Sequence, residues 1–186
     1  LSGTEHQYMW GQHLAFGQPF LEPGCQINLP TGLSIIAEVE DLEEGSFGRI
    51  PRDKQYRWPI AMDHNGKKLD LSIIPEKNTA SDIYYITGFD PIGDYSVENS
   101  RLGMGMHVQW DAKSHPYLWF WQEFGETKDY PWFGRHYNIG LEPFTSYPTR
   151  GLQEAIKNKT AVNIGSGDVK TFFMKVKPFE LEKTNI

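Results

Sequence analysis

The stretch Tyr137-Asn138-Ile139-Gly140-Leu141-Glu142-Pro143-Phe144-Thr145-Ser146-Tyr147-Pro148 combines a strand pattern with an abrupt change to a loop. Its odd positions from 137 to 141 are apolar, which is the period-two pattern of a half-buried strand. Pro143 follows at once, and a proline at a strand end removes a ladder donor and fixes the backbone. We therefore predict that the strand ends at Glu142, at a strand-to-loop junction of the kind that often holds catalytic groups. A surface acid that closes a strand fits the same local pattern.

The rest of the chain favours an antiparallel β-sandwich of the all-β class. The 186 residues suit a single domain, residues 1–186, with a sizeable core. Aromatic residues make up 14% of the chain, glycine and proline are plentiful, and a helical pattern is convincing only from Leu152 to Asn158. Apolar alternation predicts strands at 33–39, 69–75, 83–87, 95–97, 101–110, 117–124 and 137–142, and a closing hairpin that joins 161–164 to 169–176.

Charge and cysteine content narrow the classes of partner. The net charge is −6 and the basic residues are scattered, whereas a nucleic-acid surface needs clustered Lys and Arg. No apolar run approaches the roughly 18 residues that a membrane span requires. The single cysteine, Cys25, excludes an intramolecular disulfide, fits a reducing, cytoplasmic compartment, and is expected to be a small buried residue. These features favour a neutral small-molecule ligand and neither nucleic acid nor membrane.

Several charged residues are expected to be solvated. The acids from Glu38 to Glu44 read as a polar face and turn, because neighbouring side chains point apart. The arginines at 49, 52 and 57 lie in a long predicted loop, where they could reach a ligand but are more simply solvated. Asp63-His64-Asn65-Gly66-Lys67 contains Asn-Gly, the strongest short hairpin signal, and this predicts that His64 is exposed.

Two further segments carry candidate functional residues. Met9-Trp10-Gly11-Gln12-His13-Leu14-Ala15-Phe16-Gly17 places His13 among aromatic and glycine residues. Asp82 stands at the head of an aromatic strand. Taken singly, a histidine among aromatics is more often a packed core residue than a catalyst. The order of His13, Asp82 and Glu142 along the chain is more specific than any one of these residues alone.

That order resembles the aldose 1-epimerase (galactose mutarotase-like) family, especially its bacterial mutarotase-related branch. The resemblance rests on His13 followed by Phe16, on Asp82 before an aromatic strand, and on the tracts Leu118-Trp119-Phe120-Trp121-Gln122-Glu123 and Asn138-Ile139-Gly140-Leu141-Glu142-Pro143. It runs from about Met9 to about Lys177. It implies a galactose mutarotase-like supersandwich and an isomerase that interconverts the anomers of an aldohexose without a cofactor or metal.

The resemblance also implies roles for individual residues. Mutarotation needs a base for the anomeric hydroxyl and an acid for the ring oxygen, and each group contributes roughly 10²–10⁴-fold. Glu142 is the implied base, His13 the implied acid and Asp82 a binder of sugar hydroxyls. We predict that His13 and Glu142 face each other across a gap the width of a sugar ring, with Asp82 on the wall. Three further residues are expected to bind the substrate: Trp119, Trp121 and Gln122. Core packing is the ordinary alternative for the two indoles.

Other interpretations stay open. The family's domain is longer and includes upstream strands, so we expect a missing N-terminal segment or a companion chain. Loss of those strands favours an alternative, a non-catalytic carbohydrate-binding or sensing module on the same fold. A cupin-like metal enzyme would need clustered histidines, whereas His107, His115 and His136 are spread along the chain. A nucleophilic hydrolase would need a Gly-x-Ser-x-Gly elbow, which the sequence lacks.

Overall fold

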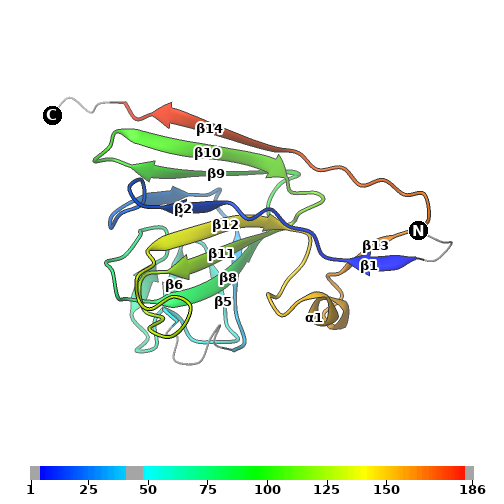
Figure 1. The fold of residues 1–186 in the computed structure, drawn as a ribbon, viewed down its shortest axis with the longest axis horizontal. Helices are drawn as coiled ribbons and strands as arrows, with labels where there is room; N and C mark the ends of the chain where they lie inside the picture. Colours follow the sequence, from blue (N-terminus) through cyan, green and yellow to red (C-terminus); the bar gives the residue numbers. More distant parts are fainter. Residues whose placement is uncertain (1–4, 41–47, 183–186) are drawn as a thin grey trace.

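The computed structural model describes residues 5–40 and 48–182, and it consists almost entirely of antiparallel strands (Figure 1). One sheet has eight strands in the order β2-β12-β11-β8-β4-β5-β6-β7, a second has four in the order β14-β10-β9-β3, and β1 pairs with β13. The elements are β1 His6–Tyr8, β2 Ala15–Gly17, β3 Gln26–Asn28, β4 Ser34–Ala37, β5 Gln55–Arg57, β6 Ile60–Met62, β7 Lys68–Asp70, β8 Ser81–Thr87, β9 Ile92–Asn99, β10 Met104–Asp111, β11 Tyr117–Glu123, β12 Asn138–Phe144, α1 Leu152–Lys157, β13 Val162–Ile164 and β14 Met174–Glu180.

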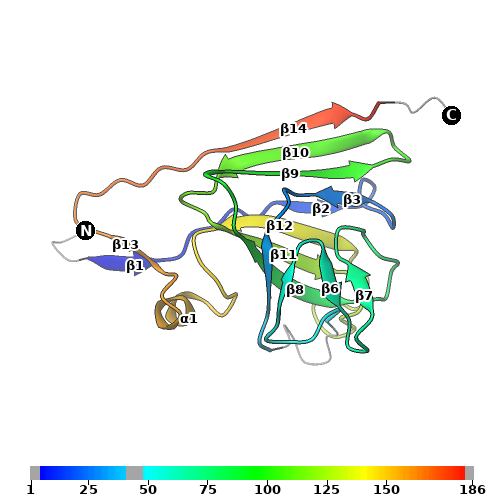
Figure 2. The ribbon, with the colours of Figure 1, turned by 180° about the vertical axis from the view of Figure 1, so that it is seen from behind.

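The core lies between the two large sheets, which Figures 1 and 2 show one above the other. Alternate residues of β9 and β10 point inward from the smaller sheet, and Tyr95 and Trp110 are fully buried there. From the larger sheet, Tyr84, Phe120 and Leu141 enter the same cluster. The predicted antiparallel β-sandwich is therefore confirmed, and it follows from period-two burial on one face of each sheet.

The opposite, outer face of the eight-stranded sheet carries a second cluster. Ile83, Tyr85 and Trp119 are its buried members, and Trp121 and Phe144 pack against them. The strand registers place several of these side chains in one row across the sheet: Ile36 opposite Tyr85, Tyr85 opposite Trp119, and Trp119 opposite Glu142. We call this the outer row. Side chains directly opposite each other on neighbouring strands are in contact distance.

Local predictions had mixed outcomes. The helix at 152–158 is confirmed as α1, and the Asp63–Lys67 turn joins β6 to β7 with Gly66 at a φ of 76° and with His64 exposed. Cys25 is free and buried, as expected. The closing hairpin is wrong, because β13 pairs with β1 and the last strand, β14, pairs with β10.

The prediction that β12 ends at Glu142 is also wrong, since β12 continues through Pro143 to Phe144. The Pro143 carbonyl accepts a hydrogen bond from Gln12 N at 3.0 Å. A residue in an antiparallel ladder directs its N–H and C=O to the same neighbour. The missing N–H of Pro143 therefore faces the edge segment around Gln12, and the bonds to β11 are preserved.

Candidate functional site

His13 and Glu142 are in direct contact: His13 Nδ1 lies 2.5 Å from Glu142 Oε1. The segment that carries His13 runs antiparallel to β12, because Gly11 pairs with Phe144 and Ala15 pairs with Gly140. Both registers place His13 opposite Glu142, and His13 thereby extends the outer row to the sheet edge. The predicted pair exists, but its members touch and do not stand on two sides of a ring-sized gap.

Gly140 makes room for this arrangement. A Cβ added at Gly140 would lie 2.1 Å from Glu142 Oε1 and 3.0 Å from its Cδ. The Glu142 carboxyl group therefore lies over the Gly140 backbone, on the face where Trp121 stands opposite Gly140. Any side chain at position 140 would occupy the volume that the carboxylate fills.

The two members of the pair differ sharply in solvent access. The His13 side chain is 64% exposed, whereas that of Glu142 is 7% exposed. Burial raises the pKa of the Glu142 carboxyl group above its ordinary value, and the neighbouring His13 offsets part of this effect. Glu142 is thus a partly desolvated carboxylate whose hydrogen-bond partner reaches into solvent.

Aromatic side chains stand beside the pair. The ring of Trp121 is 6.2 Å from that of His13 and 5.4 Å from that of Trp132, and His136 meets Trp132 edge-on at 5.0 Å. Trp121 and Trp132 are both partly exposed. We call His13, Glu142, Trp121, Trp132 and His136 the dyad site. Aromatic faces beside a few polar groups are typical of ligand sites.

The loop between β11 and β12 holds Trp132 in place. At its start the buried Glu123 carboxylate accepts hydrogen bonds from Gly125 N at 2.9 Å and from Thr127 Oγ1 at 2.7 Å. The Gly134 N–H donates to the Thr127 carbonyl at 2.7 Å, which closes the loop. The sequence prediction missed Trp132 and His136, because their place beside Trp121 depends on this loop geometry. A tryptophan within a loop, in Tyr130-Pro131-Trp132, was the available signal.

Trp119 is on the expected face but is covered. Phe144 stacks on it with ring centroids 3.7 Å apart and an interplanar angle of 6°. Its indole N–H donates to the Ser146 carbonyl at 2.9 Å. The structure therefore gives Trp119 the packing role that was the alternative to sugar stacking, while Trp121 remains open beside His13.

Asp82 and Gln122 lie away from the pair, contrary to the predicted arrangement. They are opposite each other on β8 and β11 and share the inner face with Tyr84, whereas Glu142 is on the outer face. Both are fully buried. Asp82 Oδ1 lies 2.5 Å from Arg52 Nη1, and Gln122 Oε1 accepts a hydrogen bond from Arg49 at 3.1 Å. They belong to a buried polar cluster at the ends of these strands.

Three residues expected to be solvated are instead buried or paired. Arg49 is 8% exposed, and its backbone N–H donates to Asp82 Oδ2 at 2.8 Å. The Arg52 guanidinium lies against Asp82. Glu38 is 3% exposed and lies beside Tyr85 on the outer face of the eight-stranded sheet. The Glu40 side chain is 71% exposed and lies 2.8 Å from Arg150 Nη1, and the acids at 41–44 lie outside the described residues. Burial raises the pKa of Asp82, and Arg52 opposes that shift.

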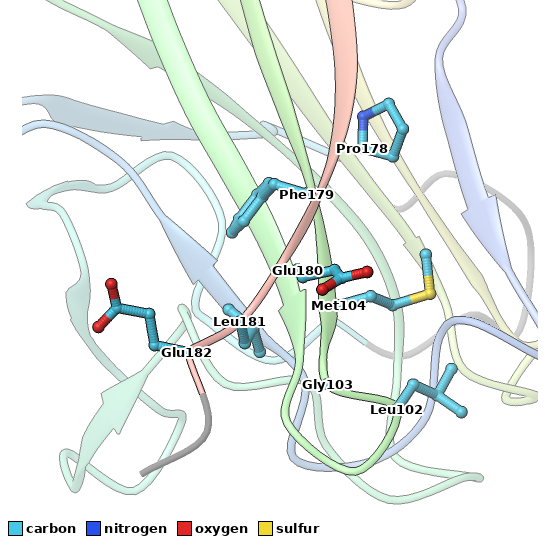
Figure 3. A pocket seen from close by; sticks show the side chains of 8 residues that line it. All are labelled: Leu102, Gly103, Met104, Pro178, Phe179, Glu180, Leu181 and Glu182. Atoms are coloured by element: carbon cyan, nitrogen blue, oxygen red, sulfur yellow. The ribbon is translucent and has the colours of Figure 1, made fainter.

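Neither a metal centre nor the hollow between β10 and β14 competes with the dyad site. Within residues 5–40 and 48–182, no group of three or more His, Cys, Asp or Glu could hold a metal ion, and no helix is long and apolar enough to cross a membrane. A hollow of about 1040 Å³ lies where β10 begins and β14 ends (Figure 3). Its polar side chains, Glu180 and Glu182, are both acidic, so it lacks an acid–base pair.

Comparisons with known proteins identify the fold. No family model matches the chain, and no curated protein does. The structure is similar to the crystal structure of a putative aldose 1-epimerase from Klebsiella pneumoniae, with a TM-score of 0.58 and 16% sequence identity. The match covers 97% of this chain and 40% of that one, so the chain spans less than half the length of its structural neighbour. The similarity extends to the fold, a β-sandwich like that of the epimerase.

Proposed function

We propose that the protein is an aldose 1-epimerase-like enzyme, an isomerase that interconverts the anomers of an aldohexose at the dyad site. The observation that carries this proposal is the 2.5 Å contact between a buried carboxylate and an exposed imidazole beside an open aromatic face. The structural similarity to a putative aldose 1-epimerase supports the same reaction class. The sugar is the partner that such a site requires, and general acid–base groups are sufficient for the reaction.

Adjacent acid and base suit this chemistry. The anomeric oxygen and the ring oxygen of a pyranose are bonded to the same carbon, so a catalyst that serves both can place its two groups side by side. Glu142 takes the proton of the anomeric hydroxyl through a carboxylate oxygen. His13 keeps Nδ1 on Glu142 and gives the proton of Nε2 to the ring oxygen. The bond between C1 and the ring oxygen breaks as the C1 carbonyl forms.

The open-chain aldehyde then rotates about the bond between C1 and C2. Ring closure reverses the proton transfers: the ring hydroxyl returns its proton to His13, and Glu142 returns a proton to the new anomeric hydroxyl. The protein finishes in its starting protonation state. Trp121 and Trp132 offer flat apolar surfaces to the C–H face of the ring, which leaves the hydroxyls for polar groups.

The test is anomer exchange of glucose and galactose, measured by NMR exchange spectroscopy above the spontaneous rate in water. Glu142→Gln keeps the shape of the side chain and removes the base. We expect exchange to fall by roughly two to four orders of magnitude while calorimetric sugar binding persists. Gln7→Glu, a change on β1 away from the dyad, is a control that should leave exchange unchanged. Equal exchange in the Glu142→Gln variant and the unaltered protein would exclude Glu142 as the base.

A carbohydrate-binding module is the second candidate function, and one observation favours it. His13 and Glu142 satisfy each other directly, and Asp82 is not beside them, so the arrangement contains fewer free polar groups than the resemblance implied. Sugar binding that is detectable by calorimetry, together with anomer exchange no faster than the spontaneous rate in water, would identify this function.

A further inference from the structure

A second polar cluster occupies the outer face of the same sheet. The Glu38 carboxylate accepts hydrogen bonds from Val39 N at 2.7 Å and from the Tyr85 hydroxyl, and Arg150 Nη2 lies 3.4 Å away. The Tyr85 oxygen also accepts a hydrogen bond from Thr149 N at 3.0 Å. Burial and the Glu38 carboxylate raise the pKa of Tyr85, so its hydroxyl stays protonated and donates. These bonds fix a buried carboxylate in one orientation.

A cavity of about 460 Å³ opens beside this cluster, and we call it the Tyr147 pocket. Tyr147 is partly exposed on its wall, with its ring 5.0 Å from that of Tyr85. Hydrogen bonds to the Tyr147 carbonyl from Asn158 Nδ2 at 2.7 Å and Thr160 Oγ1 at 3.0 Å hold that residue in place. The volume is within the usual range for small-ligand sites, about 300–1,000 Å³.

The lining of the pocket suits a neutral polyhydroxylated ligand. Three acids, Glu38, Asp53 and Glu154, stand against two lysines, Lys54 and Lys157, so the charge nearly balances. A polyanion would need an excess of basic groups. Gln55 adds an amide donor and acceptor, which suit hydroxyl groups. Tyrosine rings supply the flat apolar surface that the C–H face of a sugar requires.

The pocket lies along the outer row from the dyad site. Tyr85 on β8 and Glu142 on β12 are separated by the single strand β11, which corresponds to about 10 Å between them at the usual strand spacing. Between them stand the stacked rings of Phe144 and Trp119, and Tyr117 lies 4.9 Å from Tyr147. A continuous line of aromatic side chains therefore joins the two polar ends of one sheet face.

We propose that the Tyr147 pocket is a second sugar subsite, and that the substrate is a reducing oligosaccharide whose reducing unit occupies the dyad site. This inference rests on the proposed function of the dyad. A di- or trisaccharide that lies along the outer row reaches from Glu142 to Tyr147. The pocket contributes affinity for the longer substrate and takes no part in the proton transfers.

The experiment compares glucose with cellobiose, maltose and lactose in the NMR exchange assay. We expect kcat/KM for at least one disaccharide to exceed that for glucose by about tenfold or more, the gain of one additional well-packed subsite. Tyr147→Ala should abolish this advantage and leave glucose exchange unchanged. Tyr130→Ala, at a ring that is 80% exposed in the β11–β12 loop, is the matched control and should keep the advantage. Equal disaccharide-to-glucose ratios in the unaltered protein and the Tyr147→Ala variant would overturn the proposal.

Two measurements separate failure of this proposal from failure of the proposed function. If the unaltered protein catalyses no exchange, calorimetry with the same disaccharides decides: binding that Tyr147→Ala weakens about tenfold supports the subsite, and absence of binding refutes it. If Tyr147→Ala fails to fold, NMR of the side-chain amides of Gln55 and Asn158 in the unaltered protein decides. Chemical-shift changes of these amides on addition of a disaccharide, but not of glucose, support the subsite. Amide signals that stay unchanged with the disaccharide refute it.

Discussion

The Gly140→Ala substitution tests whether the position of the Glu142 carboxylate matters for exchange. The new methyl group would lie 2.1 Å from Glu142 Oε1, 3.0 Å from Cδ and 3.2 Å from Cγ. These are too short for unbonded atoms, so the flexible carboxyl group must move by about 1 Å or more to restore ordinary contact. The backbone can stay in place because the nearest atoms are the far end of a side chain.

Such a movement separates His13 from Glu142, the two groups of the proposed acid–base pair. The contact between His13 Nδ1 and Glu142 Oε1 is 2.5 Å, and a displacement of that size carries it beyond the normal hydrogen-bond range of about 2.7–3.2 Å. A misplacement of about 1 Å can reduce a rate by about 10²-fold. We therefore expect exchange to fall by about 10²-fold, while the free energy of unfolding changes by about 1–2 kcal/mol at most.

Gly17→Ala is the matched control. Gly17 lies on β2 and pairs with Asn138 of the same strand β12, but an added Cβ there meets its nearest atom at 3.8 Å, an ordinary contact. The two variants are compared by NMR exchange of glucose and by urea denaturation. If the Gly140→Ala variant exchanges anomers as fast as the Gly17→Ala variant, the position of the carboxylate is irrelevant and the dyad mechanism is refuted.

Three further predictions concern titration and burial. Because burial raises the pKa of Glu142, acidification should protonate this base and lower the exchange rate at a higher pH than it would for a solvated glutamate. An exchange rate that falls only at the ordinary pKa of a glutamate would contradict this. Burial lowers the pKa of His115 to about 4, below its unfolded value of about 6.5. The unfolded chain therefore binds the additional proton, and stability should decrease by about 3 kcal/mol as pH falls from about 6.5 to 4; urea denaturation of His115→Gln should lack this component. Asp82→Asn breaks a buried ion pair and should lower the free energy of unfolding by about 3 kcal/mol. The KM for glucose of the folded protein should be unchanged, and a raised KM would indicate that Asp82 binds the sugar.

The sequence predicted the sandwich because apolar residues alternate in β9, β10 and β12. In β12, Ile139 and Leu141 point into the core and Glu142 points outward, as the pattern required. β8 is different, since Ser81 to Ile86 are all buried on both faces. A strand with two buried faces has no period-two signal, so nothing in the sequence could show that Asp82 points inward.

The wrong prediction of a closing hairpin from 161–164 to 169–176 has another cause. Val169 to Val176 reads as a strand, but pairing is decided by which edge is available. The edge of β10 accepts Met174–Glu180, and β13 instead reaches β1 at the other end of the chain. The resemblance predicted that His13 and Glu142 face each other, but their direct contact was missed for the same reason. It depends on the register between an edge segment and β12, which no local pattern encodes.

The unequal exposure of His13 and Glu142 supports the roles that we propose for them. A carboxylate that is desolvated by burial is a stronger base, and this favours Glu142 as the group that removes the anomeric proton. The largely exposed His13 side chain can reach the ring oxygen of a bound sugar, which returns the proton when the ring closes. Both properties follow from position in the sheet. Glu142 is covered because β12 has neighbours on both sides, whereas His13 stands on the edge segment, where one flank is open to water.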